Sequence, residues 1–549
     1  MTFIISFLFF CLFASGCVLP QNAEEIYIRL AQTGFLSSDI KSAVVISAYK
    51  LADRKFDVIS VQNKKVVYSD FFPDTSVFYS ENFPHCYRID FSHLKNVGDY
   101  KIEINDLADV KFSIVTGKEF SKIVDSLMLF LKVQRCGPTN PLLHGKCHLS
   151  DVTSLVGNTE LTKADLTGGW HDAGDYIKFF NTTAFTTYLL LFAYEFDQSK
   201  FGFDNNDDNV PDILEEARVG IDWIRRCNFE KNNFVLQVQD IRDHSEEWRM
   251  PEDDKLRFDR PGFVGIGKNY IGIYSAVLSL AARIWKNEFY DTLFAEECLQ
   301  SAMEMFQIRN SVPDIDTTTG EYYPDNDYLG KLALAAIELY NSTGKINYLA
   351  EAKSYADSAG SDFWWSWGSL NSLAHYKLSL TDTSYLKYIT ENLQHFNNYS
   401  LKNIFNEPLP YNWGTNFYFL GVALQSILYE KIIPDSGLSS LSVLMRDYVA
   451  GRNPWGISFI YNIGTKFSEQ IHSQIGYLNN GYIPGAVASG PAPYYLIKEK
   501  AGNIPAAEED LFGSDSSVYF DNYYNFITNE ATIACNATAI FVYGFFSER

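Results

Sequence analysis

The spacing of hydrophobic residues changes once along the chain, near residue 117. Between residues 25 and 115, apolar and polar residues alternate in short runs, such as Glu25-Ile26-Tyr27-Ile28-Arg29-Leu30 and Tyr100-Lys101-Ile102-Glu103-Ile104. A period of two is typical of β-strands with one buried face. Several short strands within one small segment predict a β-sandwich over residues 24–116.

Beyond residue 118 the apolar positions recur at i, i+3 and i+4, which predicts helices. Turn-rich segments separate these helices, and no strands are expected between them. This pattern argues against a βα barrel and favours helical hairpins closed into an α/α ring over residues 118–549; a long irregular helical array is the alternative. The apolar stripes lie near residues 120–134, 182–196, 211–227, 270–286, 291–307, 329–341, 346–359, 384–396, 412–430, 437–450 and 530–546.

The N-terminus carries a short apolar run, from Phe3 to Phe13, followed by Ala14-Ser15-Gly16-Cys17. The run is too short to span a bilayer and is typical of a signal peptide core. Small residues before Cys17 resemble a lipoprotein cleavage site, although the usual positive charge before the apolar run is missing. We therefore expect residues 1–17 to direct export, either to the extracellular space or as a cell-surface or periplasmic lipoprotein anchored at Cys17. No later stretch predicts a transmembrane segment.

Charge and composition narrow the range of partners. The chain has 45 basic and 67 acidic residues, a formal net charge of −22, which argues against nucleic acid and against anionic lipid. It also has 35 Tyr, 42 Phe and 9 Trp. Aromatic faces stack on sugar rings, so this composition suits a neutral, hydroxyl-rich ligand, although most aromatic residues simply fill cores.

Three acidic residues, at two places along the chain, are candidates for chemistry. Asp172 and Asp175 flank Ala-Gly in a compact turn, where two carboxylates can share one water, one orienting it and the other removing its proton. A helix cap or a cation site is the alternative for this turn. Glu530 stands at the expected opening of the last helix, and there the alternative is a first-turn glutamate stabilised by the helix dipole.

Together with the predicted architecture, these stretches resemble glycoside hydrolase family 9, the inverting β-glycanases of the cellulase type, preceded by an immunoglobulin-like domain. The resemblance covers nearly the whole chain and implies an all-β immunoglobulin-like sandwich followed by an (α/α)6 toroid. Its motifs are Ile28-Arg29-Leu30-Ala31-Gln32-Thr33-Gly34-Phe35, Gln134-Arg135-Cys136-Gly137, Gly168-Gly169-Trp170-His171-Asp172-Ala173-Gly174-Asp175, Val210-Pro211-Asp212-Ile213-Leu214, Trp413-Gly414-Thr415-Asn416, Gly451-Arg452-Asn453-Pro454-Trp455-Gly456 and Thr528-Asn529-Glu530-Ala531.

The resemblance implies catalytic roles for three carboxyl groups. Asp175 matches the general base, Asp172 its partner in holding the nucleophilic water, and Glu530 the general acid. Base and acid should lie roughly 6.5–9.5 Å apart to admit that water, and a partly desolvated site should raise the pKa of Glu530. The implied reaction is hydrolysis of β-1,4-glucosidic bonds in cellulose or a related β-glucan.

Some positions depart from the family pattern. His472 keeps a sugar-contacting histidine, but the arginine usual in that run has no equivalent. Tyr523 replaces a second arginine near the acid, and Asn525 replaces an aspartate. We expect His472, Trp170, Tyr523 and Trp413 to bind substrate. An exo-acting enzyme on β-linked oligosaccharides, including glucosamine oligomers, is the alternative. A non-catalytic carbohydrate-binding protein is a further one, which the intact carboxylate set disfavours.

Two metal sites are candidates. Cys136, Cys147, His148 and His171 offer two thiolates and two imidazoles, a set suited to tetrahedral zinc, and some immunoglobulin-bearing family members hold structural zinc at this junction. A disulfide or free buried thiols are the alternative. The oxygen-rich loop containing Asp204 and Asp208 suggests calcium, as in related family members, although it lacks an EF-hand frame; a solvated turn is its alternative.

Overall fold

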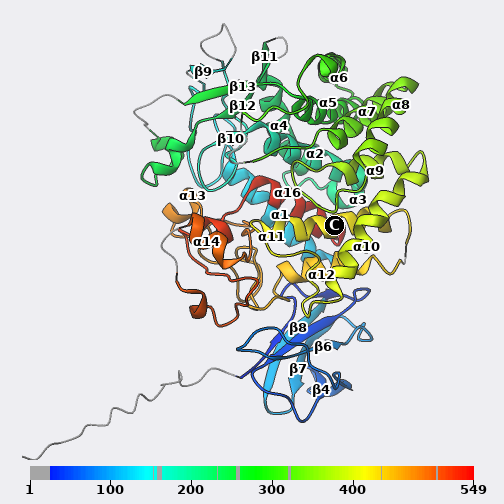
Figure 1. The fold of residues 1–549 in the computed structure, drawn as a ribbon, viewed down its shortest axis with the longest axis vertical. Coiled ribbons are helices and arrows are strands. Elements are labelled where there is room, and N and C mark those ends of the chain that lie inside the picture. Colours follow the sequence, from blue (N-terminus) through cyan, green and yellow to red (C-terminus); the bar gives the residue numbers. More distant parts are fainter. Residues whose placement is uncertain are drawn as a thin grey trace, which may run out of the picture.

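The computed structural model describes residues 25–549, apart from residues 153, 158–163, 231–232, 255–259, 319–322, 435 and 502–504. The expected signal segment 1–17, with Cys17, lies outside the described residues. A β-sandwich forms one end of the molecule and a larger helical body the rest (Figure 1). The immunoglobulin-like sandwich and the helical toroid predicted above are both confirmed in architecture.

Two sheets face each other in the N-terminal domain. One has the order β1-β3-β6 and the other β2-β8-β7-β4-β5. Alternation along β7, where Tyr100, Ile102 and Ile104 are buried, turns one face of each sheet inward onto a shared core. The strands are β1 (Ile26–Arg29), β2 (Phe35–Leu36), β3 (Ser42–Ser47), β4 (Lys55–Ser60), β5 (Val66–Phe71), β6 (His85–Asp90), β7 (Gly98–Ile104) and β8 (Ala108–Val115).

The sandwich is docked on the helical body through buried charged groups. Arg446, fully buried on helix α12 (Ser440–Val449), donates to Asp39 at 2.7 Å across the domain boundary. Arg29 donates to the carbonyl of Pro454 at 2.8 Å, and its guanidinium lies 4.4 Å from the centre of the Phe512 ring. A buried guanidinium that loses its partner is costly, so these contacts fix the two domains relative to each other.

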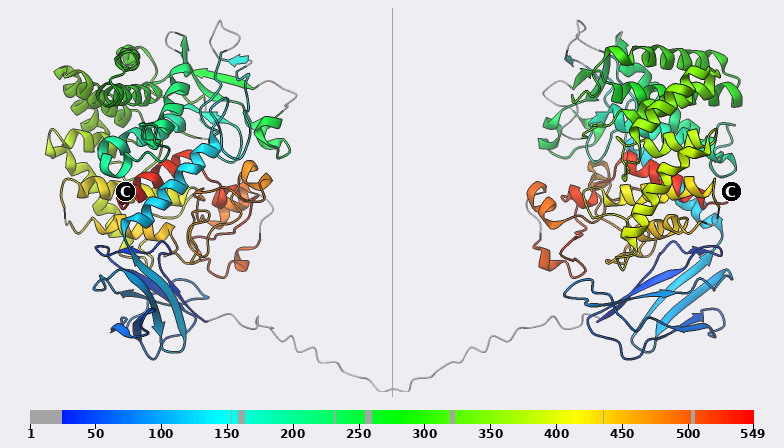
Figure 2. Two further views of the ribbon diagram at one scale, coloured as in Figure 1. Left: turned by 180° about the vertical axis from the view of Figure 1, so that it is seen from behind. Right: turned by 45° about the vertical axis from the view of Figure 1, so that its right-hand side comes forward.

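Contacts between helices close the larger body into a double ring, which lies on one side of the sandwich in both views of Figure 2. Six inner helices contact one another in the order α2-α5-α7-α9-α11-α16, and α16 returns to α2. Outer helices pack against them as partners in hairpins. The inner helices are α2 (Phe180–Phe196), α5 (Lys268–Glu288), α7 (Leu329–Thr343), α9 (Asn371–Ser379), α11 (Thr415–Glu430) and α16 (Ile533–Phe545); the outer ones are α1 (Gly117–Gln134), α4 (Asp212–Cys227), α6 (Thr292–Gln307), α8 (Ile346–Ala359), α10 (Leu386–Ser400) and α12 (Ser440–Val449).

Helix α9 was not expected from the sequence, and burial explains why. All of its residues are buried, including the polar side chains of Asn371, His375 and Lys377. A helix that is enclosed on every side needs no polar face, so it carries no stripe at i, i+3 and i+4. The inner helices α2 and α11 are almost as fully buried and were predicted, but they are 17 and 16 residues long, whereas α9 has only 9 residues.

The expectation that no strands lie between the helices is wrong. Strands β10 (Lys178–Phe179), β12 (Asn233–Val238), β13 (Pro261–Gly265) and β9 (Ser154–Val156) form one sheet in that order, and β11 (Asn228–Glu230) pairs with β12. Phe234, Val235 and Leu236 form a continuous buried run, which periodicity alone cannot distinguish from a buried helix. Residues 243–249, which follow β12, contact the turn of residues 172–176, which we call the catalytic turn after its expected role.

Shorter helices complete the described fold. They are α3 (Gln198–Phe201), α13 (Gln474–Leu478), α14 (Tyr494–Lys500) and α15 (Phe526–Asn529), with 3-10 turns η1 (Ile241–Ser245), η2 (Pro251–Asp253), η3 (Ile308–Ser311), η4 (Thr383–Tyr385) and η5 (Ala507–Glu509). Within the described part of the chain, every helix is too short or too polar to cross a membrane.

Candidate active site

Asp175 lies in the turn that follows Trp170 and precedes β10. One carboxylate oxygen accepts from the backbone N–H of Ile177 at 2.9 Å, and the other lies 2.5 Å from Nε2 of His244 on η1. Burial raises the pKa of Asp175, but the hydrogen bond and the positive charge of His244 outweigh it and hold this pKa below its usual value. The same contact raises the pKa of His244 to about 9. Asp175 is therefore ionised and His244 is protonated at neutral pH.

Asp172 is a buried carboxyl group whose oxygens both accept hydrogen bonds. The hydroxyl of Thr182 donates to one oxygen and the hydroxyl of Tyr323 donates to the other. Burial is the main cause that raises the pKa of Asp172 to about 7. Its backbone carbonyl accepts from the N–H of Ile533 at 3.0 Å, so the turn is tied directly to the first residue of α16.

Glu530 does not open the last helix, as expected from the sequence, but lies in extended backbone between α15 and α16. Its Oε1 accepts from the N–H of Gly174 at 3.3 Å, which places the carboxyl against the catalytic turn. A Cβ at Gly174 would lie 2.6 Å from the carbonyl of His472, so glycine is required for this approach. Burial and the negative charge of Asp175 raise the pKa of Glu530 to about 8. Glu530 is therefore protonated at neutral pH.

His472 faces the same carboxyl group. Its Nδ1 donates to the carbonyl of Tyr523 at 2.6 Å, which leaves Nε2 directed at Glu530, 4.0 Å from Oε1. Its backbone N–H donates to the carbonyl of Asn529 at 3.0 Å. Burial lowers the pKa of His472, so the ring is neutral with Nε2 free to accept.

Aromatic side chains extend from His472 toward solvent, and we call Trp248, Tyr477 and Tyr524 the aromatic wall. Trp248 packs edge-on against His472 with ring centres 5.3 Å apart, and lies 5.0 Å from Tyr477 and 5.4 Å from Tyr524. Tyr524 is 63% exposed. The aromatic wall therefore extends from His472, which faces Glu530, to the protein surface.

The remaining expected substrate-binding residues fall into two groups. Trp413 is exposed and packs against Phe526, which in turn contacts His472, so its role stays a prediction; the same holds for the half-buried Tyr523. The expectation that Trp170 binds substrate is wrong. It is fully buried, and its indole N–H donates to Glu216 at 2.8 Å, so no sugar can stack on it.

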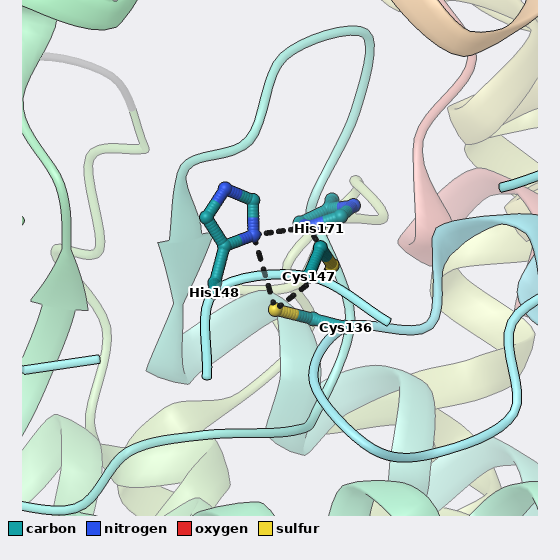
Figure 3. A group of neighbouring side chains, drawn as sticks. All are labelled: Cys136, Cys147, His148 and His171. Carbon is teal, nitrogen blue, oxygen red and sulfur yellow. Dashed lines mark hydrogen bonds between the residues drawn. The ribbon is translucent and has the colours of Figure 1, made fainter. Parts of the chain in front are cut away.

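The four expected zinc ligands converge at the junction beside the catalytic turn (Figure 3). Nδ1 of His148 lies 3.2 Å from Nε2 of His171 and 3.5 Å from the sulfur of Cys136. The sulfur of Cys147 lies 3.9 Å from that of Cys136 and 3.8 Å from Nε2 of His171. A sulfur–sulfur distance of this size excludes a disulfide in this structure.

These distances can be compared with a tetrahedral site. Bonds of about 2.05 Å to nitrogen and 2.3 Å to sulfur place tetrahedral ligand atoms about 3.3 Å apart for two nitrogens and about 3.8 Å apart for two sulfurs. The measured 3.2 Å between the imidazole nitrogens and 3.9 Å between the thiol sulfurs match both values. The cluster is therefore a candidate metal centre with the four ligands that the sequence named.

The acidic loop does not form a comparable group. Asp204 accepts from the backbone N–H groups of Asp208 and Asn209, and Asp208 accepts from that of Val210 at 2.9 Å. Among the described residues, the cysteine–histidine cluster is the group whose side-chain ligand atoms converge. A calcium ion at Asp204 and Asp208 stays a prediction.

Comparison with known proteins agrees with the geometry. Residues 120–543 match the model of glycosyl hydrolase family 9, and residues 23–109 match that of the cellulase N-terminal ig-like domain. The chain belongs to glycosyl hydrolase family 9. The family assignment rests on a match to more than three quarters of the chain, and it confirms the resemblance inferred from the motifs.

Two relatives and one solved structure match most of this chain. Endoglucanase D of Acetivibrio thermocellus is 23% identical over 526 residues, which cover 88% of this chain and 82% of that protein. A cellulose 1,4-beta-cellobiosidase of the same organism is 24% identical, over 97% of this chain and 68% of that protein. The solved structure of a metagenome-derived family 9 endoglucanase superposes with a TM-score of 0.80 at 23% identity, covering 95% of this chain and 99% of that one. It shows the same fold.

Sequence reasoning missed three residues of this family 9 site. They are His244, Tyr323 and Trp248, which lie in loops. The number of residues between these loops and the catalytic turn does not predict that they meet it in the fold. A lone histidine or tyrosine in a polar loop is common, and only the fold brings these side chains to Asp175, Asp172 and His472. The adjacent Asp243-His244 pair was the available signal.

Proposed function

We propose that this family 9 hydrolase cleaves β-1,4-glucosidic bonds in cellulose or a related β-glucan with inversion. The observation that carries the assignment of roles is the pair of opposite pKa shifts on two carboxyl groups, Asp175 in the turn and Glu530 against it. Glu530 is held protonated by burial and by Asp175, whereas Asp175 is held ionised by His244. Two carboxyl groups pushed apart in this way are an acid and a base at the same pH.

Each group then makes one proton transfer. Glu530 gives its proton to the glycosidic oxygen as the bond from that oxygen to the anomeric carbon breaks and the electron pair leaves with the oxygen. Asp175 takes a proton from water as the water oxygen bonds to the anomeric carbon from the opposite face. Asp172 holds this water from its place beside Asp175. The product of a β-glycoside is the α-anomer.

The substrate assignment is supported by the relatives and by the aromatic wall. Relatives named as an endoglucanase and as a cellobiosidase act on β-1,4-linked glucan according to their names. The aromatic wall of Trp248, Tyr477 and Tyr524 offers ring faces on the acid side, where a leaving sugar would lie. Cleavage within the chain is our lead assignment, and release of short products from chain ends is the second.

The metal assignment is a structural zinc ion bound by Cys136, Cys147, His148 and His171. A closed set of two thiolates and two imidazoles leaves no open position for water, so the ion would hold the junction and take no part in hydrolysis. Nε2 of His148 donates to Asp254 at 2.9 Å, the carboxylate contact typical of a metal-bound histidine. Export, with or without a lipid at Cys17, remains part of the proposal.

Two measurements test the reaction. Proton NMR of fresh digests of a β-glycoside should show the α-anomer before mutarotation; an initial β-anomer contradicts the assignment of Asp175 as base. Viscosity of a soluble cellulose derivative, followed together with reducing ends, should fall early if cleavage is internal. Slow loss of viscosity with release of only monomers or dimers assigns the enzyme to chain ends instead.

A further inference from the structure

A chain of charged side chains connects the candidate metal centre with the loop that holds His244. Asp254, which accepts from Nε2 of His148, also accepts from Nε of Arg249 at 2.7 Å. The other end of the same guanidinium donates to Asp243 at 2.5 Å. Arg249 therefore bridges the carboxylate that contacts the metal site and the carboxylate beside His244.

Asp243 ties this loop to the catalytic turn. Its second oxygen accepts from the backbone N–H of Tyr176 at 3.1 Å, one residue after Asp175. The next residue, His244, makes the 2.5 Å contact with Asp175. The hydroxyl of Tyr176 donates to the carbonyl of Arg249. Tyr176 therefore contacts both ends of the segment that runs from Asp243 to Arg249.

Burial makes this bridge energetically important. The side chains of Asp243 and Asp254 are fully buried and that of Arg249 is 15% exposed. Removing Arg249 takes a buried positive charge from Asp243, which is costly, whereas Asp254 keeps its contacts with Arg260 at 3.4 Å and His148 at 2.9 Å. The planar fork of arginine presents separate N–H groups to the two carboxylates in a fixed geometry, whereas lysine would have to reach both from one compact ammonium group.

We propose that Arg249 is a positioning residue that connects the metal centre to the general base. Through Asp254 and Asp243 it holds His244 on Asp175, so that occupation of the metal site strengthens the contact between His244 and Asp175. This inference rests on the proposed function, since it takes Asp175 to be the base. Arg249 itself touches neither substrate nor metal ligand.

The charged surroundings of the pair set the sign of the effect. Removing His244 from Asp175 leaves that carboxylate buried beside other acidic groups, so its pKa must rise, while the pKa of His244 must fall toward its ordinary value. The titratable and charged groups that face the pair are Asp172, Asp243, Tyr323, His472 and Glu530.

The experiment replaces Arg249 and follows His244 directly. The chain has 9 histidines, few enough for NMR titration of labelled imidazoles, and His244→Asn identifies the signal of interest. In Arg249→Met we expect the pKa of His244 to fall by at least about one pH unit. The acid limb of kcat/KM should move to higher pH by a comparable amount, with metal content retained. Arg249→Lys should fall between Arg249→Met and the unchanged protein.

Arg242→Met is the matched control. Arg242 lies in the same loop, two residues before His244, is half-exposed, and pairs with Asp240 at 2.6 Å. Arg242→Met removes one positive charge from the same loop, as Arg249→Met does, but it leaves the contacts that Arg249 makes with Asp243 and Asp254 in place. We expect it to leave the His244 titration unchanged. Loss of a positive charge by itself raises the pKa of a nearby imidazole, so an equal fall in Arg242→Met would mean that a general disturbance of the loop, and not the bridge, is responsible.

Metal removal tests the other end of the chain. Chelation of the unchanged protein should lower the pKa of His244 as Arg249→Met does, and added Zn²⁺ should restore it. In Arg249→Met, chelation should have no further effect, because both changes break the same chain. Additive effects, or a loss of thermal stability in Arg249→Met with an unchanged His244 titration, would overturn the proposal.

The outcome also separates this inference from the proposed function. If the His244 signal shifts in Arg249→Met but the acid limb of kcat/KM stays in place, the positioning role holds and Asp175 is not the base. If Arg249→Met does not fold, Arg249→Lys and the chelation of the unchanged protein carry the test.

Discussion

Nε2 of His244 lies 2.5 Å from the carboxylate of Asp175, although 69 residues separate them in the sequence. This contact decides the protonation of the site, because the protonated imidazole keeps a buried carboxylate ionised next to Glu530 and Asp172. In the proposed acid–base pair, the ionised state of Asp175 therefore depends on a third residue, His244.

A pH profile of His244→Asn tests this dependence. The pKa of Asp175 should rise once its cationic partner is gone, so the acid limb of kcat/KM should move to higher pH, by about one unit or more. The pKa of Glu530, about 8 with His244 present, should rise as well, since the imidazolium lowers it. Both limbs should therefore move in the same direction.

The control for this variant is His395→Asn on α10. His395 is an exposed histidine on the outer ring, where it packs against Phe363. Its profile should match that of the unchanged enzyme. An unmoved acid limb in His244→Asn would show that another group sets the protonation of Asp175.

Glu530→Gln tests the general acid. The amide keeps the shape of the side chain but has no proton to give, so turnover of unactivated glycosides should fall by at least about 10²-fold. Glycosides with very acidic leaving groups need little protonation and should lose much less. Glu469→Gln, an exposed carboxyl group on the neighbouring segment, is the control. Equal losses on both substrate types would mean that Glu530 has a structural role.

Tyr524→Ala tests the aromatic wall. Stacking on an exposed ring binds substrate and transition state alike, so KM should rise while kcat stays nearly constant. With aromatic contacts worth about 0.5–1.5 kcal/mol, the increase should be roughly two- to twelve-fold, for oligosaccharides long enough to reach the ring. Tyr495→Ala, also 66% exposed but on α14, is the control. A change in kcat with constant KM would place Tyr524 outside the binding surface.

The sequence predicted much of this fold, and the misses share a cause. Alternating residues in β7 and the stripes of the outer helices reflect elements with one solvent face, which periodicity detects. Helix α9 and strand β12 are buried on both sides, so their residues carry no such period. Burial also explains Trp170, which follows a glycine pair in a catalytic motif but packs against Glu216.

The candidate site shows the same limit in another form. Asp172, Asp175 and Glu530 stand in motifs, so a resemblance could assign them. His244 and Tyr323 act through distances that the ring of helices creates, and no local pattern marks them. The four proposed metal ligands could be named from the sequence because their donor chemistry is distinctive even where their spacing is not, and the fold brings them together.

Cys147→Ser tests the metal centre. The serine oxygen is a poor zinc ligand, so the purified variant should contain much less than the one zinc per chain expected of the unchanged protein. Because metal binding holds the junction between α1 and the catalytic turn, the melting temperature should fall by at least about 5 °C. Metal analysis and calorimetry give both values.

Cys298→Ser separates loss of metal from loss of a buried thiol. Cys298 is a fully buried free cysteine on α6, so its replacement places the same hydroxyl in an apolar site without removing a ligand. We expect it to keep the metal and to lose less stability than Cys147→Ser, and chelation should lower its melting temperature as it lowers that of the unchanged protein. Chelation should have little effect on Cys147→Ser, whose site is already broken. The zinc assignment would be contradicted if the protein, as purified, held no metal and had a disulfide between Cys136 and Cys147. That outcome would leave the roles of Asp175 and Glu530 intact.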